Sequence, residues 1–496
     1  MINDLLYASP MAVMILGAFV LMLISRNKLT LQKFNFITVS FLLTSLLLQL
    51  YLFDKAGSMY LFESAFGKTF ILDKFAKLFD LLFTIGSILT LLINTDYFKS
   101  RSYFNGEYFA IILFSVFGMM MLSHSNELVS SFISLEIASL SIYALVGYHK
   151  NKKASSEAMM KYIILGSLAG AIFMLGVAII YGAVGSTVFN DITAYVHARE
   201  IPDMTMIFIG ASLLMVTIMF KIGAVPFNSW VIDVYHGAPS PITMFMASTF
   251  KISIFAIALR LYLVNFASVN AFWIEALQII TIATLIGGSL LAISQQNIKR
   301  MLAASSIVHT GYMLIALSSI GLGAKLAEPA LMFYLIAYFL SSVGAFGIIS
   351  FLSSNRQFNL TYEDFKGFAD RRPYMALLMS IFMLSLAGFP STIGFLGKFY
   401  IFTSSIESGQ ILLTALGIAT AFISVYYYFK LIAVMYFYSS DEKPTKLPIN
   451  ISTVLIFIMA GSVIWGGIGT NLIPFIPGAD GFINLALEAA ESLNAK

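Results

Sequence analysis

Glu136 and six basic residues fall inside long apolar stretches of this 496-residue chain. The six basic residues are Lys161, Lys221, Lys251, Arg260, Lys398 and Lys430. A charge at the centre of a membrane span costs at least about 2.5–3.5 kcal/mol, so residues of this kind usually pair with one another and have a function. Glutamate and lysine side chains at that depth indicate ion translocation, and these residue types favour protons as the ion.

Two of these lysines lie close to an expected break in a helix. Lys221 stands in TIMFKIGAVPFNSW and Lys398 stands in LAGFPSTIGFLGKF. The expected breaks are at Gly223 and Pro226 and at Gly388 and Pro390. Proline removes a backbone donor and clashes with the preceding turn, and in lipid the freed groups must be satisfied by protein or water. We therefore predict that each lysine is a switchable charge beside a water-accessible break.

Each buried charge also has a structural interpretation, which the sequence leaves open. Glu136 can be a neutral acid bonded to a neighbouring helix, and Lys221 a cation that Glu136 merely neutralises. Lys430 and Lys161 lie nearer the ends of their stretches, where a long side chain reaches the membrane surface. Arg260 is expected to be an interfacial anchor near the outer end of its helix.

Two histidines join the list of candidate residues. His309, in KRMLAASSIVHTGYMLIAL, is placed to connect the lysines, and histidine titrates near physiological pH. His236 follows the first break, where we expect it to meet entering water. The other three histidines fall in connections, and no spacing suits a haem or a metal. The chain has no cysteine, which excludes disulfides, cysteine-ligated iron–sulfur clusters and thiol catalysis.

The elements that must position these residues are membrane spans. The chain is 59% hydrophobic and 11% charged, whereas a soluble domain carries roughly 25% charged residues. We therefore predict an all-α polytopic membrane protein, in which the first apolar stretch is a span rather than a cleaved signal. Fourteen spans are expected near residues 9–25, 35–52, 77–95, 108–123, 127–148, 158–183, 205–235, 240–263, 271–293, 297–320, 328–352, 374–404, 409–437 and 450–470.

The basic residues of the connections set the expected orientation. Sixteen of them lie in connections that follow odd-numbered spans, against seven in the remaining connections and the tails. Basic connections face the cytoplasm, so both termini are predicted to lie on the opposite, periplasmic side of a bacterial inner membrane.

The two expected breaks also indicate an internal repeat. GAVP in the seventh span matches AGFP in the twelfth, and interrupted helices in corresponding places point to inverted repeats around a site in mid-membrane. Spans 4–8 and 9–13 would form the two five-helix repeats. Within a single membrane domain, 1–496, we predict three N-terminal helices in 1–105, repeats in 106–265 and 270–438, and a last helix and tail in 439–496.

Long stretches of this sequence resemble subunit N of proton-pumping NADH:quinone oxidoreductase, respiratory complex I, an antiporter-like membrane subunit. The matching stretches include LEIASLSIYALVGY with Glu136, KYIILGSLAGAIFMLGVAIIYGAVGS from Lys161, FKIGAVPFNSWVIDVYHGAPSPITMFMASTFKI with Lys221 and Lys251, QQNIKRMLAASSIVHTGYMLI with His309, GFPSTIGFLGKFYIF with Lys398, and VYYYFKLI with Lys430. Residues 1–100 and 440–496 resemble the family only in length and hydropathy. A lysine at position 398 distinguishes subunit N from its sister subunit M, and the length excludes subunit L.

The resemblance implies a role for each of the central residues. Glu136 and Lys221 would be the pair that gates a proton, Lys251 and His309 the connecting relay, and Lys398 the group that exchanges protons with one face. The family usually has histidine and proline where this chain has Asn228 and Ile232. We hypothesise that His236 takes the place of the missing histidine as a proton inlet.

The resemblance also implies a large assembly around the chain. No cofactor would be bound here, and NADH, FMN, iron–sulfur clusters and quinone would belong to partner subunits. The partners would be the antiporter-like subunits L and M and the small subunits K, J, A and H, within the lipid bilayer and without nucleic acid. Two alternatives stay open, a subunit of an Mrp-type sodium/proton antiporter and a structural spacer whose internal charges only hold the membrane arm together.

Overall fold

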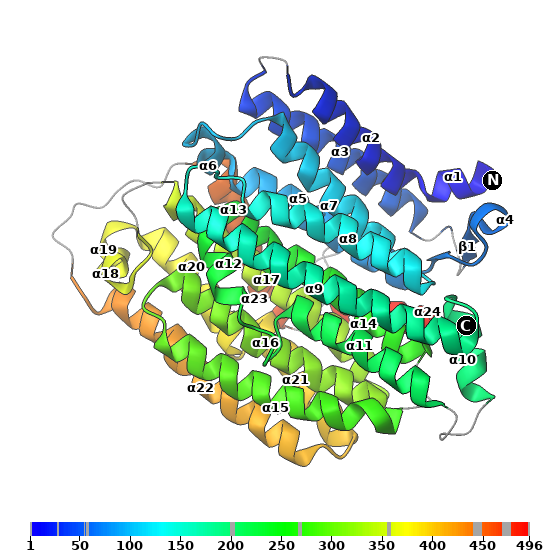
Figure 1. Cartoon of the computed structure of the whole chain (residues 1–496). Coiled ribbons are helices and arrows are strands. Elements are labelled where there is room, and N and C mark those ends of the chain that lie inside the picture. The colour runs from blue at the N-terminus through cyan, green and yellow to red at the C-terminus, as the bar shows by residue number, and fades with distance from the viewer. Residues whose placement is uncertain are drawn as a thin grey trace.

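A computed structural model describes residues 2–26, 29–53, 55, 59–198, 204–265, 270–354, 359–439, 449–468 and 478–494 of the chain. Most of its helices run side by side (Figure 1). Those that follow the predicted spans are α2 (Ser9–Ile24), α3 (Leu31–Leu52), α5 (Lys74–Ile93), α7 (Gly106–His124), α8 (Leu128–Val146), α9 (Lys153–Val184), α11 (Thr205–Ile222), α15 (Asn270–Ser294), α16 (Ile298–Gly321), α17 (Ala327–Ser353), α20 (Pro373–Ala387), α21 (Ile393–Glu407), α22 (Ile411–Tyr436) and α23 (Ile451–Ile468).

Shorter elements connect or follow these helices. They are α1 (Ile2–Tyr7), β1 (Met59–Leu61), α4 (Glu63–Phe66), β2 (Phe70–Leu72), α6 (Thr95–Lys99), α10 (Phe189–His197), α12 (Val231–Gly237), α18 (Tyr362–Phe365), α19 (Phe368–Arg371) and α24 (Ala479–Asn494). The antiparallel hairpin of β1 and β2 and the terminal helix α24 were not expected from the sequence. Lys74 anchors α24 through an ion pair to Glu488 at 2.8 Å.

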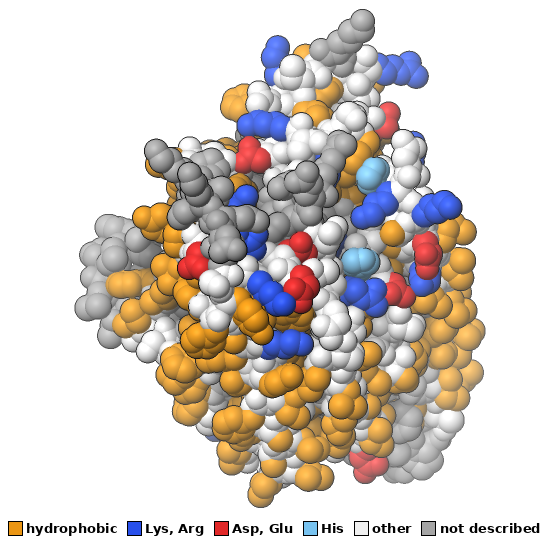
Figure 2. Space-filling model, turned by 90° about the vertical axis from the view of Figure 1, so that its left-hand side faces the viewer, with side chains coloured by type: hydrophobic (Ala, Val, Ile, Leu, Met, Phe, Trp, Pro, Cys, Tyr) orange, Lys and Arg blue, Asp and Glu red, His pale blue; other side chains and the backbone are white. Residues whose placement is uncertain are grey.

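The described helices confirm a polytopic all-α membrane protein. Twelve of them are long and apolar enough to cross a membrane, and Ser9–Ile24 and Pro373–Ala387 are shorter apolar helices. The count of fourteen spans therefore stays a prediction. Charged side chains gather on one end face of the molecule, whereas much of the surface below them is hydrophobic (Figure 2).

Both predicted helix breaks are present and share one backbone geometry. Helix α11 ends before Gly223, whose φ is +73°, and α20 ends before Gly388, whose φ is +86°. After each glycine, the next amide donates to a carbonyl five residues back, Ala224 to Met219 and Phe389 to Leu384, both at 2.9 Å. This positive-φ ending turns the chain sharply while it satisfies backbone groups, and glycine alone adopts it without strain.

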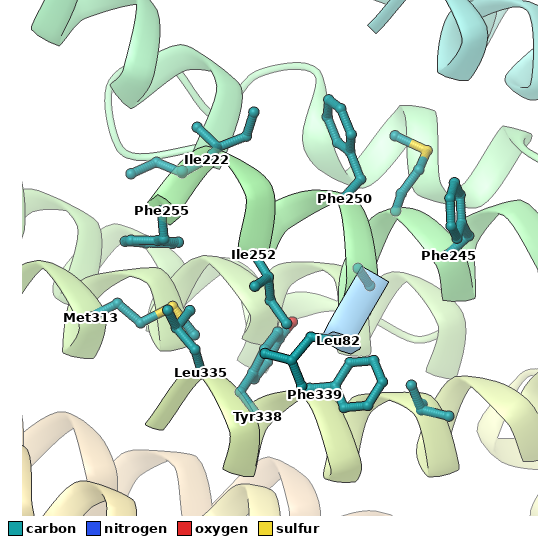
Figure 3. Close-up of a cluster of buried hydrophobic side chains, with 14 of the residues drawn as sticks. Leu82, Ile222, Phe245, Phe250, Ile252, Phe255, Met313, Leu335, Tyr338 and Phe339 are labelled. Atoms are coloured by element: carbon teal, nitrogen blue, oxygen red, sulfur yellow. The ribbon is translucent and has the colours of Figure 1, made fainter. Parts of the chain in front are cut away.

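The span that carries Lys251 combines α-helical and π-helical turns. It consists of α13 (Ser240–Phe245), the π-helical segment η2 (Met246–Phe250), α14 (Lys251–Leu259) and the π-helical segment η3 (Arg260–Asn265). Phe250, Ile252 and Phe255 of this span belong to the same buried apolar cluster as Leu335 and Phe339 of α17 (Figure 3). Lys251 starts α14 directly after the first π-helical turn, inside this buried span.

Arg260 lies inside the protein, which corrects its expected place as an anchor at the membrane interface. Its guanidinium is fully buried and donates two hydrogen bonds to Asp73, at 2.9 and 2.7 Å, and one to the Ser123 carbonyl at 2.6 Å. The Asp73 carboxylate also accepts from the Ala76 amide at the start of α5. Asp73 could not be predicted as the partner of Arg260, because the two residues are far apart along the chain.

The Arg260→Met variant should lower the free energy of unfolding by about 3–5 kcal/mol, because it leaves the Asp73 carboxylate buried without its cation. Combining it with Asp73→Asn should recover much of that loss, since no uncompensated charge remains. Thermal unfolding of the purified protein in detergent measures both, with exposed Lys325→Met as the control. A double variant no more stable than the single one would show that lost packing sets the cost.

Candidate functional site

Glu136 and Lys221 lie together in the described structure, as the sequence predicts. The Lys221 Nζ atom is 3.7 Å from Glu136 Oε1, and the lysine is 2% exposed. The ammonium donates to Ser139 Oγ at 2.8 Å and to Tyr143 OH at 3.0 Å, both on the same helix α8 as Glu136. Lys221 thus has two neutral acceptors in hydrogen-bond range while its carboxylate partner is close by but not bonded.

Two glycines of α9 make room for this pair. A Cβ atom added at Gly170 would lie 3.1 Å from Glu136 Oε1, and one added at Gly166 would lie 2.0 Å from Tyr143 OH. The second distance is far below any real contact, so the Tyr143 hydroxyl occupies its place only because residue 166 has no side chain. The sequence stretch LGSLAG therefore shapes the site from the neighbouring helix.

Lys251 is connected to the end of α11 through one threonine. Its Nζ donates to the Ser306 carbonyl at 2.9 Å and to Thr310 Oγ1 at 3.1 Å. The Thr310 hydroxyl is 3.2 Å from the carbonyl of Ile222, the residue directly after Lys221. A path of hydrogen-bonding groups therefore leads from the first break to the second buried lysine.

His309 has a tyrosine hydroxyl on each ring nitrogen. Its Nδ1 is 2.6 Å from Tyr334 OH and its Nε2 is 3.0 Å from Tyr428 OH. A hydroxyl can donate or accept, so both nitrogens keep a partner in either neutral tautomer and in the protonated ring. Tyr338 lies between this histidine and Lys251, with its ring centre 5.0 Å from the imidazole and 5.9 Å from Lys251 Nζ.

Lys398 closes the series at the second break. Its Nζ donates to the carbonyls of Leu386 and Ala387, at 3.0 and 2.8 Å, which are the last residues of α20. Tyr312 bridges it to His309, with its ring centre 4.9 Å from the ammonium and 5.8 Å from the imidazole. The lysine therefore binds carbonyls that the helix break leaves without an intrahelical partner.

The structure does not join Lys161 and Lys430 to this series through any described contact. Lys161 forms ion pairs with Glu157 at 2.9 Å and Asp233 at 3.0 Å, and its side chain is 42% exposed. Lys430 lies over the Tyr362 ring at 4.3 Å. Both positions agree with the interfacial interpretation that the sequence left open.

His236 lies in α12, beyond residue 235, where the predicted seventh span ends. Burial, and then the positive charges of Lys299 and Arg300, lower the pKa of its imidazole to about 4. The ring is therefore neutral at physiological pH. Its Nδ1 atom is buried and has no hydrogen-bond partner among the described residues.

Sequence reasoning missed the hydroxylated side chains that surround the buried charges. Those that hydrogen-bond them are Ser139, Tyr143, Ser306, Thr310, Tyr334 and Tyr428. Tyr312 and Tyr338 contribute ring contacts, and their hydroxyls have no hydrogen-bond partner among the described residues. A signal was present for two of them, because Tyr334 and Tyr338 are four residues apart and so lie on one face of a helix.

Sequence reasoning also missed a second buried pair, formed by His124 and Asp80, because it assigned no function to His124. The His124 Nε2 atom is 2.8 Å from Asp80 Oδ2, and its Nδ1 is 2.9 Å from the Ile71 carbonyl. A carbonyl only accepts, so Nδ1 carries a proton and a further proton lies between Nε2 and the carboxyl group. Ser123 donates to the other carboxyl oxygen at 3.0 Å.

The chain is similar to known proteins over most of its length. Residues 125–424 match the family described as NADH:quinone oxidoreductase/Mrp antiporter, TM. NADH-quinone oxidoreductase subunit N of Trichlorobacter lovleyi is 37% identical over 414 residues, which cover 83% of this chain and 84% of the relative. A chain of respiratory complex I from Thermus thermophilus has a TM-score of 0.77 at 28% identity, covering 93% of this chain and 98% of that one.

One further solved structure shares the fold. A chain of the Mrp complex from Dietzia sp. DQ12-45-1b has a TM-score of 0.78 at 20% identity, and the match covers 100% of this chain and 95% of that one. Interrupted helices with buried lysines beside the breaks, on this fold, define an antiporter-like polytopic membrane protein. With the match to curated relatives over most of its length, the chain belongs to the subunit N family of NADH-quinone oxidoreductases.

Gly166→Ala and Gly182→Ala should change stability in opposite directions, although both lie in α9. The first forces the Tyr143 hydroxyl away from its place, and overpacking of this kind costs about 1–3 kcal/mol. The second meets nothing within 4 Å, and alanine stabilises a helix by about 0.5–1 kcal/mol relative to glycine. Thermal unfolding of the purified variants measures both, and equal shifts would contradict the assigned place of Tyr143.

Proposed function

We propose that this chain carries protons across the membrane as a subunit of an NADH-quinone oxidoreductase, in which other subunits perform the electron transfer. The observation that carries the proposal is the Glu136–Lys221 pair at a helix break. Thr310, which accepts from Lys251, also bonds the carbonyl of Ile222, the residue after Lys221. The family to which the chain belongs supports the assembly. The chain is thus part of a translocase and adds the proton path to it.

The first step of the proposed mechanism takes place between Glu136 and Lys221. Their separation of 3.7 Å exceeds a charge-assisted hydrogen bond by about 1 Å, so a small movement closes or opens the pair. When it is closed, the carboxylate stabilises the charged lysine. When it is open, the ammonium depends on the neutral hydroxyls of Ser139 and Tyr143, and releasing its proton costs less.

We propose that the released proton passes towards Lys251 and His309. Thr310 lies between the Ile222 carbonyl at the end of α11 and Lys251, and the Tyr338 ring lies between Lys251 and His309. His309 can take a proton on one nitrogen and give it up from the other, because each nitrogen faces a hydroxyl. Lys398 would then exchange the proton with one face of the membrane, and we assign His236, Lys161 and Lys430 to proton entry on the strength of the sequence alone.

The finer features of the assembly are part of the same proposal. The partners would be subunits L, M, K, J, A and H, and these or further subunits would hold NADH, FMN, iron–sulfur clusters and quinone. The membrane would be a bacterial inner membrane with both termini in the periplasm. The shared geometry of the two breaks supports inverted repeats in 106–265 and 270–438, between the flanking segments 1–105 and 439–496.

Purification of the tagged chain from its native membranes tests the assembly. We expect a large complex with NADH- or other donor-dependent quinone reductase activity, because the curated relatives match over most of the chain. An Mrp-type antiporter shares the fold and would emerge with a few small membrane proteins. Vesicles that exchange sodium for protons under an imposed gradient, without any electron donor, would replace the proposal by this alternative.

Lys221→Met should lower the number of protons moved per electron while assembly and quinone reduction persist. Proton transfer by a positioned side chain is worth about 10²–10⁴-fold in rate, so flux through this chain should nearly stop. Lys325→Met, an exposed lysine, is the matched control. A failure of Lys221→Met to assemble, with an unchanged proton yield in what remains, would instead support the spacer interpretation.

A further inference from the structure

A polar cavity of about 330 Å³ lies where the ends of several spans meet, away from the buried proton path. Residues of five parts of the chain line it. They belong to α6 and the segment after it, the connection between α8 and α9, the end of α12, the start of α16 and the end of α17. Figure 2 shows an end face of the molecule, where Lys, Arg, His, Asp and Glu side chains gather. The cavity is therefore at the level of the membrane surface rather than in the apolar core.

The charged residues that line the cavity are all basic. Arg101, Lys152 and Lys299 contribute three cations, and His149 and His236 contribute two imidazoles. None of the described lining residues is a carboxylate. A cavity of this composition attracts anions.

The two cations with described hydrogen bonds have neutral partners. Lys299 is 4% exposed and donates to the carbonyls of Ala238 at 2.7 Å and His236 at 3.3 Å. Arg101 donates to the Ser353 carbonyl at 2.9 Å. Carbonyls satisfy N–H groups but do not neutralise the charge, and a buried ammonium without a counter-charge is costly. An anion in the cavity would remove this cost.

His236 supplies independent support for a missing ligand. Its Nδ1 atom is buried without a described partner, which is uncommon for a polar atom in a native structure. Burial, and then the positive charges of Lys299 and Arg300, lower its pKa to about 4. A bound anion would give the ring nitrogen a partner and oppose the positive charges that act on the ring.

We propose that the cavity between Arg101, Lys152, Lys299 and His236 is a binding site for a phosphate group. Its volume exceeds that of a single halide ion, and the planar guanidinium of Arg101 matches two oxygens of a phosphate. The phosphate belongs either to an anionic phospholipid headgroup, for which basic pockets at span ends are typical, or to a soluble phosphate. Room for the rest of a larger ligand exists in an adjoining cavity of about 560 Å³, which shares Arg101, His149 and Lys152 and also contains Glu107.

The test measures binding to the purified, delipidated assembly with two separate probes, inorganic phosphate and short-chain phosphatidylglycerol. We expect saturable binding of at least one probe, and the probe that binds identifies the source of the phosphate. The variant Arg101→Gln with Lys152→Gln should bind at least about tenfold more weakly, since each removes a charged donor. Lys153→Gln, an exposed neighbour that does not line the cavity, should bind like the unchanged protein.

Two outcomes would overturn the proposal. One is the absence of saturable binding of either probe, and the other is an equal loss in the double variant and in Lys153→Gln. If the double variant does not assemble, Lys152→Gln alone is measured in its place. The Lys152 side chain is exposed, and replacing it removes no described hydrogen bond. Binding is read without proton movement, so the result is independent of the function proposed above.

Discussion

The cost of burying an ammonium group governs the arrangement of this protein's interior. Lipid offers no acceptor for such a group, so the protein must supply every one. Lys221 depends on two hydroxyls and a nearby carboxylate, and Lys251 on two hydroxyls and a carbonyl. Arg260 instead has a bonded carboxylate, Asp73. The fixed ion pair is a structural anchor, whereas the loosely compensated lysines are the residues to which we assign proton transfer in the proposed function.

The sequence was sufficient to locate the charges and the breaks that accompany them. Charged residues stand out in apolar stretches, and Gly223 and Gly388 with their following prolines interrupt helices for reasons that act over only a few residues. The gate pair followed from the resemblance to a known family. Its polar surroundings did not, because serine, threonine and tyrosine occur throughout membrane helices and only tertiary packing selects which of them reach a given lysine.

Partners that are far apart along the chain could not be predicted from the sequence either. Arg260 and Asp73 meet across most of the N-terminal half of the chain, and nothing local to Arg260 distinguishes a buried ion pair from a side chain at the membrane interface. The same is true of His124 and Asp80, which the sequence placed in different segments. Gly166 shows the limit most clearly, since its importance comes from the absence of a side chain beside a hydroxyl on another helix.

The two breaks share a backbone geometry but give their lysines different surroundings. Lys221 precedes its break and bonds side chains on α8, one turn from a carboxylate, so its environment can change with small movements of that helix. Lys398 follows its break and bonds two carbonyls of α20, which are fixed by the backbone. A carboxylate lies beside Lys221, whereas none of the described carboxylates bonds Lys398. The two lysines therefore have different electrostatic surroundings. In the proposed proton path, the Lys221 end therefore responds to the opening and closing of an ion pair, whereas the backbone holds Lys398 in place.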